Sequence, residues 1–597
     1  MAEDKSKIPS AGKGKAVEHA KDPKAAVRFL WKYLKEYKML LLFALLLTLA
    51  ANTFALIGPE LSGKAIDSLK GKGLVDFETA FKYAKLMILF YVGSAILSYI
   101  LALLMRSITQ KIVKHMRKDV FDKLMKLPVS YFDTHMAGDI ISRVSYDIDV
   151  INTSLSTDVV QILASTVTII GSFIMMVKIS PILVLVMCVT IPCSFMYTKK
   201  MTKITRPKFS YRSKKLGEMN GFVEETVGGQ KVIQGFAREN VYVDRFSKVN
   251  IEATEAYYQA DYMNATIGPS VNMINNLSLC LVTIFGALLY FLGNMTLGNV
   301  SSFVLYSRKF SGPINEAANI IGELQSALAA AERVNRILSE DNEPADIENA
   351  LKLYDVKGNV SVKDVQFGYT PEKLILKDFS LEAPAGKLIA VVGPTGAGKT
   401  TLINLLMRFY DPVSGEIRVD GYENKEVTRA SLRSSYAMVL QDTWVFGGTI
   451  FENIAYGKEN ATMEEVVEAA KAARIHSFIM HQPQGYDTVL TEDGVNISKG
   501  QKQLLTIARA MLLDANMLIL DEATSNVDTR TEKKIQSAME KLMEGKTCFI
   551  IAHRLSTIEH ADEIIVVADG RIQEKGRHEE LMAKRGAYYE LYAAQIK

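Results

Sequence analysis

The two halves of the chain differ in how their apolar residues are distributed. Long stretches without charge fill residues 39–307, and no stretch of comparable length follows them. A membrane-spanning helix needs about 20 mostly apolar residues. From about Asn359 onward, short β-branched runs alternate instead with helical stretches. The pattern predicts a transmembrane domain followed by an α/β domain.

Six spans are predicted in the first half. Tyr262–Ser307 is uncharged for forty-six residues, which is too long for one span. Gly293-Asn294 with Gly298-Asn299 predicts a tight turn inside it, between a fifth span and the start of a sixth. The first four spans are Met39–Gly58, Leu86–Met105, Val159–Val177 and Ile179–Thr198.

The basic residues predict the orientation, because cytoplasmic loops carry an excess of Lys and Arg. The first 38 residues hold ten of them, Arg106–Asp158 holds eight and Lys199–Asp261 holds twelve. Pro59–Lys82, with four lysines, weakens the contrast. The N-terminus and both long loops are therefore expected in the cytoplasm, and an even number of spans places the C-terminal domain there too.

The two long loops are predicted to continue the membrane helices. Apolar residues recur at helical spacing in the first loop, and few Gly or Pro residues interrupt either loop. A 25-residue extension would project about 37 Å. The residues that show the pattern are Ile112, Met116, Val120, Phe121 and Leu124.

Three charges fall near the middle of the sixth span if that span begins by Val300. They are Arg308, Lys309 and Glu316. Charges at membrane depth are costly and usually face a water-filled cavity. Lys309 and Glu316 are seven residues apart and share a helix face, and Gly312-Pro313 should bend the helix between them. Alternatively, the span begins earlier and the charges lie at the cytoplasmic boundary.

The composition excludes few classes of function. The net charge of the 597 residues is +4, which is too small to indicate a nucleic-acid partner. Residues 1–24 are polar and are expected to be a disordered basic arm, without the features of a signal peptide. The four cysteines, Cys188, Cys193, Cys280 and Cys548, have no metal-ligand spacing.

A phosphate-binding loop follows the predicted strand Leu388–Val392 directly. Its sequence is Gly393-Pro394-Thr395-Gly396-Ala397-Gly398-Lys399-Thr400, the pattern G-x-x-x-x-G-K-[ST]. The glycines let backbone N–H groups surround the phosphates, and the next helix adds positive potential at its N-terminus. Lys399 is expected to neutralise β- and γ-phosphate oxygens, and Thr400 to offer its hydroxyl to Mg²⁺. Kinases, GTPases and motor proteins share this loop.

An acidic pair follows a second buried strand. Met517-Leu518-Ile519-Leu520 ends in Asp521 and Glu522, which predicts a parallel strand that delivers both acids to the phosphates. Asp521 is predicted to hold Mg²⁺ and Glu522 to polarise the attacking water. Alternatively, the two acids only cap the next helix.

A further segment, Asn496-Ile497-Ser498-Lys499-Gly500-Gln501, is predicted to open a helix that runs to about Leu513. This segment resembles the L-S-G-G-Q signature of the ATP-binding cassette (ABC) family. The family's other marks appear in order. Tyr369 resembles the aromatic residue that stacks on adenine, and Gln441 the glutamine that reports to the membrane domain. Ser525-Asn526-Val527-Asp528 resembles the loop that crosses the dimer seam, and His553 the switch that contacts the γ-phosphate.

The resemblance implies ATP and Mg²⁺ as cofactors and a set of site residues. Glu522 and His553 would be catalytic, while Thr400, Gln441 and Asp521 would hold Mg²⁺. Nucleotide contacts would come from Tyr369, Gly393, Pro394, Thr395, Gly396, Ala397, Gly398, Lys399, Thr400, Thr401, Gln441, Ser498, Gly500, Gln501 and Asp528.

The whole layout is similar to the half-size exporters, such as bacterial multidrug and lipid pumps. The implied fold is an α-helical six-span transmembrane domain fused to an α/β P-loop nucleotide-binding domain with a mixed sheet and a helical subdomain. The expected boundaries are 25–338 for the first domain, 339–358 for a linker and 359–597 for the cassette. Two segments resemble the coupling loops of these exporters. They are Tyr131-Phe132-Asp133 through Ser142-Arg143 and Glu224-Glu225-Thr226 through Ile233.

The implied function is ATP-driven export, or flipping, of amphipathic drugs, lipids or peptides across the cytoplasmic membrane by alternating access. The alternative is an ATP-gated channel or a regulatory protein, and intact Glu522 and His553 favour the pump. Nothing in the sequence distinguishes among the cargo classes, and no nucleic acid is expected.

A second half-transporter is required, because in this family each phosphate loop faces the signature of the other cassette. The signature here has Ile497 in place of Leu and Lys499 in place of the first Gly. Losing that glycine removes backbone freedom where the chain approaches phosphate. An altered signature beside intact ATP-side residues resembles the catalytic-glutamate subunit of heterodimeric exporters. The sequence therefore predicts a heterodimer in preference to a homodimer.

Overall fold

The computed structural model describes residues 22–69, 75–370, 372–441, 443–491, 494, 496–521, 528–551 and 558–596. These residues form two compact units. The first comprises the chain up to Leu127 together with His135–Glu340, and the second comprises Pro128–Thr134 with Asp341–Lys597.

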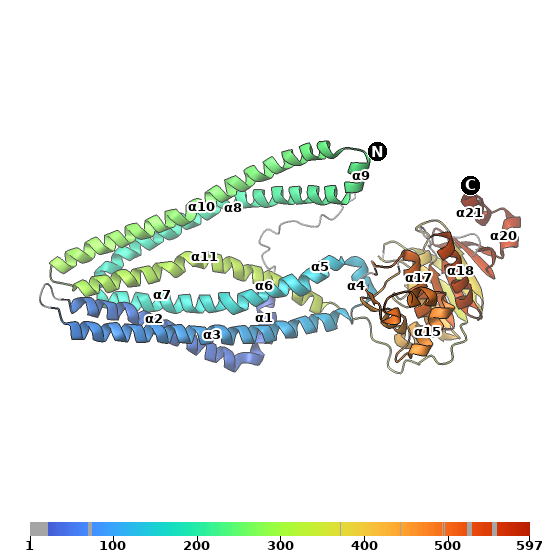
Figure 1. The fold of residues 1–597 in the computed structure, drawn as a ribbon, viewed down its shortest axis with the longest axis horizontal. Coiled ribbons are helices and arrows are strands. Elements are labelled where there is room, and N and C mark those ends of the chain that lie inside the picture. Colours follow the sequence, from blue (N-terminus) through green and yellow to red (C-terminus); the bar gives the residue numbers. More distant parts are fainter. Residues whose placement is uncertain are drawn as a thin grey trace. The chain divides into compact units, whose positions relative to one another are not determined.

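The first unit consists of long helices with short connections (Figure 1). Ser180 alone separates α7 from α8, as the sequence predicted for the third and fourth spans. Four helices, α3, α8, α10 and α11, have 43 to 53 residues and run well beyond membrane thickness, so the predicted helical extensions of the membrane helices are present. The helices are α1 (Pro23–Leu34), α2 (Lys38–Asp67), α3 (Phe77–Leu124), α5 (Ala137–Ser142), α6 (Ile148–Thr153), α7 (Val159–Ile179), α8 (Pro181–Gly228), α9 (Gln230–Gly235), α10 (Glu239–Phe291) and α11 (Leu297–Ser339).

Five helices in the described residues are long and apolar enough to cross a membrane, and α11 is not among them. Arg308, Lys309 and Glu316 interrupt the apolar part of α11. The count of six spans therefore stays a prediction. It is supported by packing, because α11 lies along α2 and α7, and both of these contain candidate spans.

The turn before α11 is shorter than the sequence indicated. Residues 292–296 make the turn, with Gly293 in the left-handed region at φ +76°. Gly298 instead lies inside α11, where a Cβ atom would sit 2.0 Å from the carbonyl oxygen of Gly63 on α2. Gly298 is therefore needed for the close approach of two helices and not for the turn.

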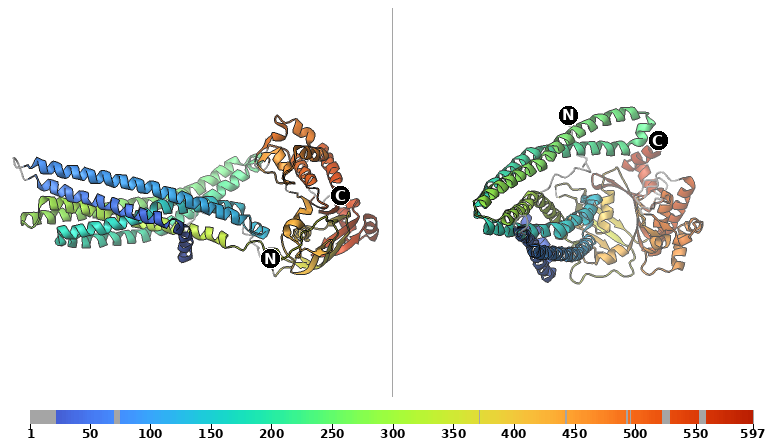
Figure 2. Two further views of the ribbon diagram at one scale, coloured as in Figure 1. Left: turned by 90° about the horizontal axis from the view of Figure 1, so that it is seen from below. Right: turned by 60° about the vertical axis from the view of Figure 1, so that its left-hand side comes forward.

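Hydroxyl groups and large apolar side chains hold this helix bundle together. Tyr306 donates a 2.6 Å hydrogen bond to the carbonyl of Leu56, and Ser302 donates a 2.8 Å bond to that of Pro59. Phe303 and Leu183 are fully buried in the same cluster. Figures 1 and 2 show α8 and α10 running together as a pair joined by α9, with their outer parts apart from α2, α3, α7 and α11.

The second unit is built on two sheets. A four-stranded antiparallel sheet has the order β2-β1-β4-β5, and a six-stranded mixed sheet has the order β12-β11-β3-β10-β9-β6. The strands are β1 (Val360–Phe367), β2 (Leu376–Ala383), β3 (Leu388–Val392), β4 (Ser414–Val419), β5 (Tyr422–Glu423), β6 (Tyr436–Val439), β9 (Met517–Asp521), β10 (Thr547–Ile551), β11 (Glu563–Ala568) and β12 (Arg571–Gly576), with a separate pair, β7 (Gly448–Thr449) and β8 (Val489–Leu490).

Each face of the six-stranded sheet is covered, and this explains its unbroken apolar strands. One face packs against the four-stranded sheet through residues such as Phe379 and Phe549, and the other packs against helices through Leu518 and Ile550. The helices are α12 (Lys399–Leu406), α13 (Arg429–Ser434), α14 (Ile450–Ala455), α15 (Met463–Ala472), α16 (His476–Met480), α17 (Lys499–Leu513), α18 (Thr529–Met543), α20 (His578–Lys584) and α21 (Ala587–Ile596). The predicted mixed sheet with a helical subdomain is confirmed.

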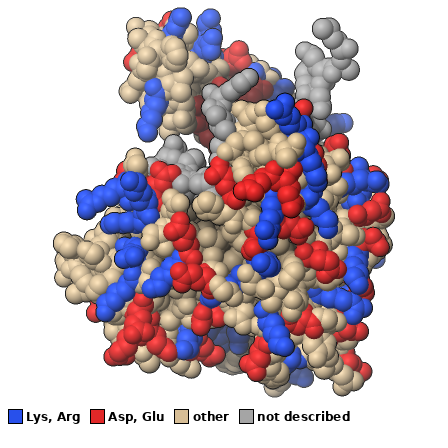
Figure 3. Space-filling model, turned by 90° about the vertical axis from the view of Figure 1, so that its right-hand side faces the viewer, with Lys and Arg blue, Asp and Glu red and all other residues tan. Residues whose placement is uncertain are grey.

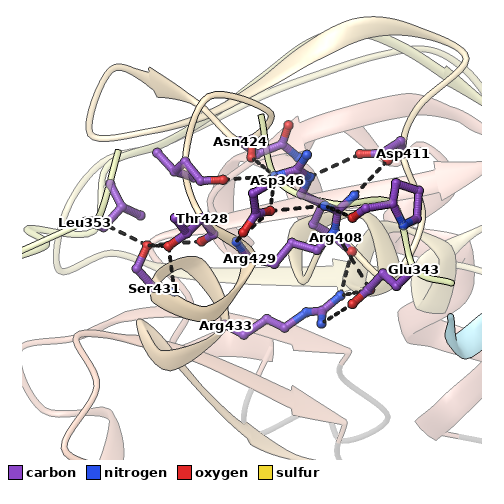
Figure 4. Close-up of polar contacts among 12 residues, drawn as sticks. Glu343, Asp346, Leu353, Arg408, Asp411, Asn424, Thr428, Arg429, Ser431 and Arg433 are labelled. Atoms are coloured by element: carbon purple, nitrogen blue, oxygen red, sulfur yellow. Dashed lines mark hydrogen bonds and ion pairs between the residues drawn. The ribbon is translucent and has the colours of Figure 1, made fainter. Parts of the chain in front are cut away.

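The segment after Asp341 is fastened to the cassette by a cluster of arginines and acids (Figure 4). Arg433 forms a two-pronged contact with Glu343, and the buried Arg429 donates to Asp346 at 3.1 Å. Arg408, also buried, donates to the carbonyls of Asn424 and Val427 at 2.7 and 3.0 Å. Buried guanidinium groups of this kind are tolerated because most of their donors have partners. The Nε of Arg429, which makes no hydrogen bond, still lies 3.8 Å from the Glu343 carboxylate. The cluster makes this segment part of the second unit.

Candidate ATP-binding site

Three parallel strands bring the predicted site residues to one edge of the six-stranded sheet. β3 ends at Val392 before the phosphate loop, β9 ends at Asp521, and β6 ends two residues before Gln441. Because parallel strands end at the same edge, the loop, Asp521 and Gln441 converge there. Glycine-rich backbone, a carboxylate and an amide are thereby gathered where a nucleotide phosphate can bind.

The phosphate loop needs its glycines for backbone reasons. Gly393 has φ +152°, and a Cβ atom there would lie 2.1 Å from the carbonyl oxygen of Val567 on β11. Gly398 has φ +104°, and a Cβ atom there would lie 2.7 Å from the Leu376 side chain. Both positions therefore exclude other residues. Pro394, Thr395 and Gly396 between them are exposed to solvent.

Lys399 lies within this loop at the first position of α12. Its ammonium donates to the carbonyls of Gly393 and Pro394 at 2.8 and 3.0 Å. Burial lowers the pKa of Lys399, and the negative charge of Asp521 partly opposes that shift. A phosphate group would replace these carbonyls as the acceptor, and its negative charge would offset the cost of desolvating the ammonium.

Tyr369, the predicted adenine-stacking residue, is half exposed beside the first turns of α12. Its hydroxyl accepts from the Asn404 amide at 3.0 Å and lies 3.3 Å from the Thr401 hydroxyl. Its ring lies edge-on to Phe367 and to Tyr410, with both centroids 5.1 Å away. These contacts hold the Tyr369 ring in place from behind.

Tyr410 connects this aromatic cluster to the short helix α4 (Val129–Thr134). Its hydroxyl donates a 2.6 Å hydrogen bond to the Asp133 carboxylate, and both residues belong to the second unit. Burial and the nearby Asp133 raise the pKa of Tyr410, so the phenol stays protonated and remains a donor. The sequence had indicated Asp133 as part of a coupling loop, but it did not indicate Tyr410 or Asn404.

The altered signature lies at the start of α17. Ser498 is the N-cap residue, and a capping box joins it to Gln501 with bonds of 2.8 and 3.3 Å. Lys499 is the first helical residue and is exposed, whereas Gly500 is buried. Lys499 does not have positive φ, so the argument that glycine freedom is lost at Lys499 is not supported by this backbone. Any effect of Lys499 must come from its side chain.

Some predicted site residues cannot be placed. Glu522, His553 and Ser525-Asn526-Val527 lie outside the described residues. Asp528 is described and is the N-cap residue of α18, where it accepts from the Thr531 backbone N–H at 2.9 Å. That bond holds the pKa of the Asp528 carboxyl below its usual range.

The available ligands suit Mg²⁺ better than a transition metal. No group of three or more His, Cys, Asp or Glu side chains that could hold a metal occurs within the described part of the chain. Mg²⁺ is typically held by one or two carboxylates together with phosphate oxygens and water. Asp521, the Thr400 hydroxyl and the Gln441 amide at one sheet edge fit that pattern.

The fold and the site define a P-loop ATP-binding domain joined to a helical membrane domain. The model of the ABC transporter transmembrane region matches residues 41–314, and that of the ABC transporter domain matches residues 376–525. The chain belongs to the ABC transporter family, in the exporter arrangement that fuses both domains.

Two curated relatives and one solved structure are similar to this chain over most of its length. It is 43% identical over 543 residues to a fatty acid ABC transporter ATP-binding/permease protein of Mycobacterium bovis, covering 91% of this chain and 85% of that one. It is 33% identical over 513 residues to an ATP-dependent lipid A-core flippase of Syntrophus aciditrophicus, covering 86% and 85%. A bacterial Atm1-family ABC exporter with ATP bound has a TM-score of 0.74 at 28% identity, covering 94% of this chain and 98% of that one.

The expected activity class is thereby confirmed. The chain is a multi-pass membrane protein that binds ATP and couples its hydrolysis to export. ABC exporters work as dimers, so this chain supplies one half of the transporter.

The link between Tyr410 and Asp133 can be tested by Tyr410→Phe. The ring that supports Tyr369 stays, while a charge-assisted bond worth about 1.5–3 kcal/mol is removed. We expect hydrogen exchange at residues 129–134 to become about tenfold faster or more, and nucleotide affinity to stay within about twofold. Mass spectrometry of the full chain in detergent would measure the exchange. Tyr422→Phe, at an exposed tyrosine on β5, is the control, and equal exchange in both variants would contradict the link.

Proposed function

We propose that this chain moves amphipathic molecules with an anionic head group across the cytoplasmic membrane, with its N-terminus and cassette in the cytoplasm. The observation that carries the proposal is the pair of cations on α11. Arg308 is exposed and Lys309 is half buried, and no ion pair joins either to a carboxylate among the described residues. The relatives that act on fatty acids and on lipid A-core agree with an anionic amphiphile.

The position of the two cations supports a role at membrane depth. Lys309 lies twelve residues after Leu297, the first residue of α11, which is about 18 Å along the helix axis. That is roughly the centre of a 30 Å hydrocarbon layer. An unpaired cation there costs about 2.5–3.5 kcal/mol on insertion scales. A carboxylate or phosphate head group would offset that cost.

Glu316 is less available as a partner for these cations. Its carboxylate accepts a 3.2 Å hydrogen bond from the Gln161 amide of α7. Lys309 and Glu316 are two helical turns apart, about 10 Å along the axis. The three side chains therefore leave a net positive charge on this part of α11.

A row of amides on α10 was not predicted from the sequence to be functional. Asn264, Asn272, Asn275 and Asn276 are spaced so that they occupy about a third of the helix circumference. Three of them are exposed and Asn275 is half buried. Polar side chains at membrane depth usually face a cavity or another helix. We therefore assign this face, with Arg308 and Lys309, to the transport path.

The head-group preference can be tested with amphiphiles of one chain length. We expect a fatty acid to stimulate the ATPase of the reconstituted transporter more than the corresponding alcohol or trimethylammonium compound. The double variant Arg308→Gln, Lys309→Gln should lose most of that preference, about tenfold in half-maximal concentration. Lys178→Gln, at an exposed lysine near the end of α7, is the control. Equal stimulation by all three amphiphiles would contradict the anionic substrate without affecting the assignment as an ATPase.

We also propose that the second half of the transporter is a different chain and that Mg²⁺ is bound by Thr400, Gln441 and Asp521. The motive for a heterodimer is Lys499, which adds a cation at the start of α17, where the family has glycine. In the proposed dimer this side chain would face the γ-phosphate bound by the partner. The ATP site formed by the partner's phosphate loop and the altered signature of this chain would then be impaired. The site formed by this chain's own phosphate loop would be competent.

The dimer proposal can be tested by purifying this chain alone and with a candidate partner. We expect the chain alone to have little ATPase activity, and the pair to be active. Lys499→Gly should raise the activity of the chain alone if the side chain impairs the site. Lys502→Gln, in the same helix turn, is the matched charge control. A stable dimer of this chain alone with robust stimulated ATPase activity would overturn the heterodimer.

A further inference from the structure

A pocket on the cassette, away from the phosphate loop in sequence, is lined by basic and hydroxyl side chains. Its volume is about 480 Å³, and it lies where the end of α15 and the start of α16 meet α18. Small-molecule sites usually occupy about 300–1,000 Å³. The lining residues are Lys471, Arg474, His476, Ser477, Lys533, Lys534 and Ser537.

The charge of this pocket is one-sided. Four lining residues are Lys or Arg and none is Asp or Glu. No ion pair in the described residues involves Lys471, Arg474, Lys533 or Lys534. Elsewhere on the cassette, lysines do pair, as Lys458 does with Glu465 at 2.6 Å. Figure 3 shows the usual surface pattern, with basic and acidic side chains interspersed.

Hydrogen bonds fix the conformation of the residues that α15 and α16 contribute to the pocket wall. Arg474 follows the end of α15 in the left-handed conformation, at φ +59°, and its N–H donates to the Lys471 carbonyl at 3.1 Å. Glycine or asparagine is usual at such a position. The His476 ring is fixed by a 2.8 Å hydrogen bond between its Nδ1 and the hydroxyl of the buried Tyr486.

We propose that this pocket binds a small anion that carries several phosphate groups or a phosphorylated head group. Lysine ammonium groups act as point charges for phosphate, and the arginine fork can bind two oxygens at once. Ser477 and Ser537 add hydroxyl donors. An anion there would remove the mutual repulsion of four unpaired cations.

Such an anion would connect two parts of the catalytic domain. α18 begins one residue after Asp528, and α17, whose N-cap is Ser498, packs against both α15 and α18. An anion that joins α15 and α16 to α18 would restrain movement of the signature helix α17 against α18 and its N-cap residue Asp528. The proposed role is therefore regulation of ATP hydrolysis, by a ligand distinct from the ATP that is hydrolysed.

The test is isothermal titration calorimetry on the full-length transporter in detergent, with its ATP sites filled by ADP and vanadate. The probes are tripolyphosphate and glycerol 3-phosphate, which stand for a soluble polyphosphate and for a lipid head group. We expect at least one to bind once per copy of this chain. The double variant Lys533→Gln, Lys534→Gln should weaken binding about tenfold for each charge-assisted bond lost. Lys541→Gln, at an exposed lysine on the same helix, should leave it unchanged.

A second readout separates a regulatory site from simple charge attraction. The probe that binds should change the basal ATPase rate of the unmodified transporter and not that of the double variant. Lys533 and Lys534 are exposed, so the variant should fold and keep its basal rate. The proposal is overturned if neither probe binds, if the double variant binds as tightly as the unmodified protein, or if the ATPase rate does not respond.

Discussion

Everything that this chain does with ATP depends on where its buried parallel strands end. β3, β9 and β6 are largely buried, and apart from Tyr436 at the start of β6 their side chains are apolar up to Asp521, the last residue of β9. Polar groups can appear only where each strand leaves the sheet, and parallel strands leave it at one edge. The phosphate loop, Asp521 and Gln441 follow from that constraint. Lys399, turned back onto the carbonyls of Gly393 and Pro394, keeps the loop closed on itself until a phosphate group takes their place.

The membrane half has the opposite constraint, because any polar group at membrane depth must find a partner or face water. Hydroxyls such as those of Ser302 and Tyr306 find backbone carbonyls on α2. Arg308 and Lys309 have no such partner in the described residues. Polar groups that have a hydrogen-bond partner therefore contribute to helix packing. Those without a partner mark the proposed transport path.

The sequence predicted much of this molecule because strong local signals determine it. Apolar length predicted α2, α3, α7, α8 and α10, and the run from Leu388 to Thr400 predicted β3, the phosphate loop and α12. Gly298 was misjudged, since a glycine needed for close helix contact has the same appearance in a sequence as one in a turn. Lys499 was predicted to impair the signature because it lacks the backbone freedom of the glycine it replaces. Lys499 is the first residue of α17 and does not have positive φ, so its position does not require glycine.

Contacts between distant residues could not be predicted in the same way. Tyr410 and Asp133 are separated by 277 positions, and Arg433 and Glu343 by 90. A tyrosine or an arginine has many partners of suitable chemistry along the chain, and only the fold selects one. The same holds for the basic pocket, whose lysines on α15 and α18 are unremarkable until the two helices meet.

We propose that hydrolysis at this chain's own phosphate loop, with Glu522 as the base, drives transport. The most direct measurement is ATP-dependent uptake of a labelled fatty acid by inside-out vesicles that hold the transporter with Glu522→Gln. We expect the variant to bind ATP still, while hydrolysis and uptake fall together by about 10²–10⁴-fold. Uptake that continues near the unmodified rate while the partner's own site is also inactivated would contradict it.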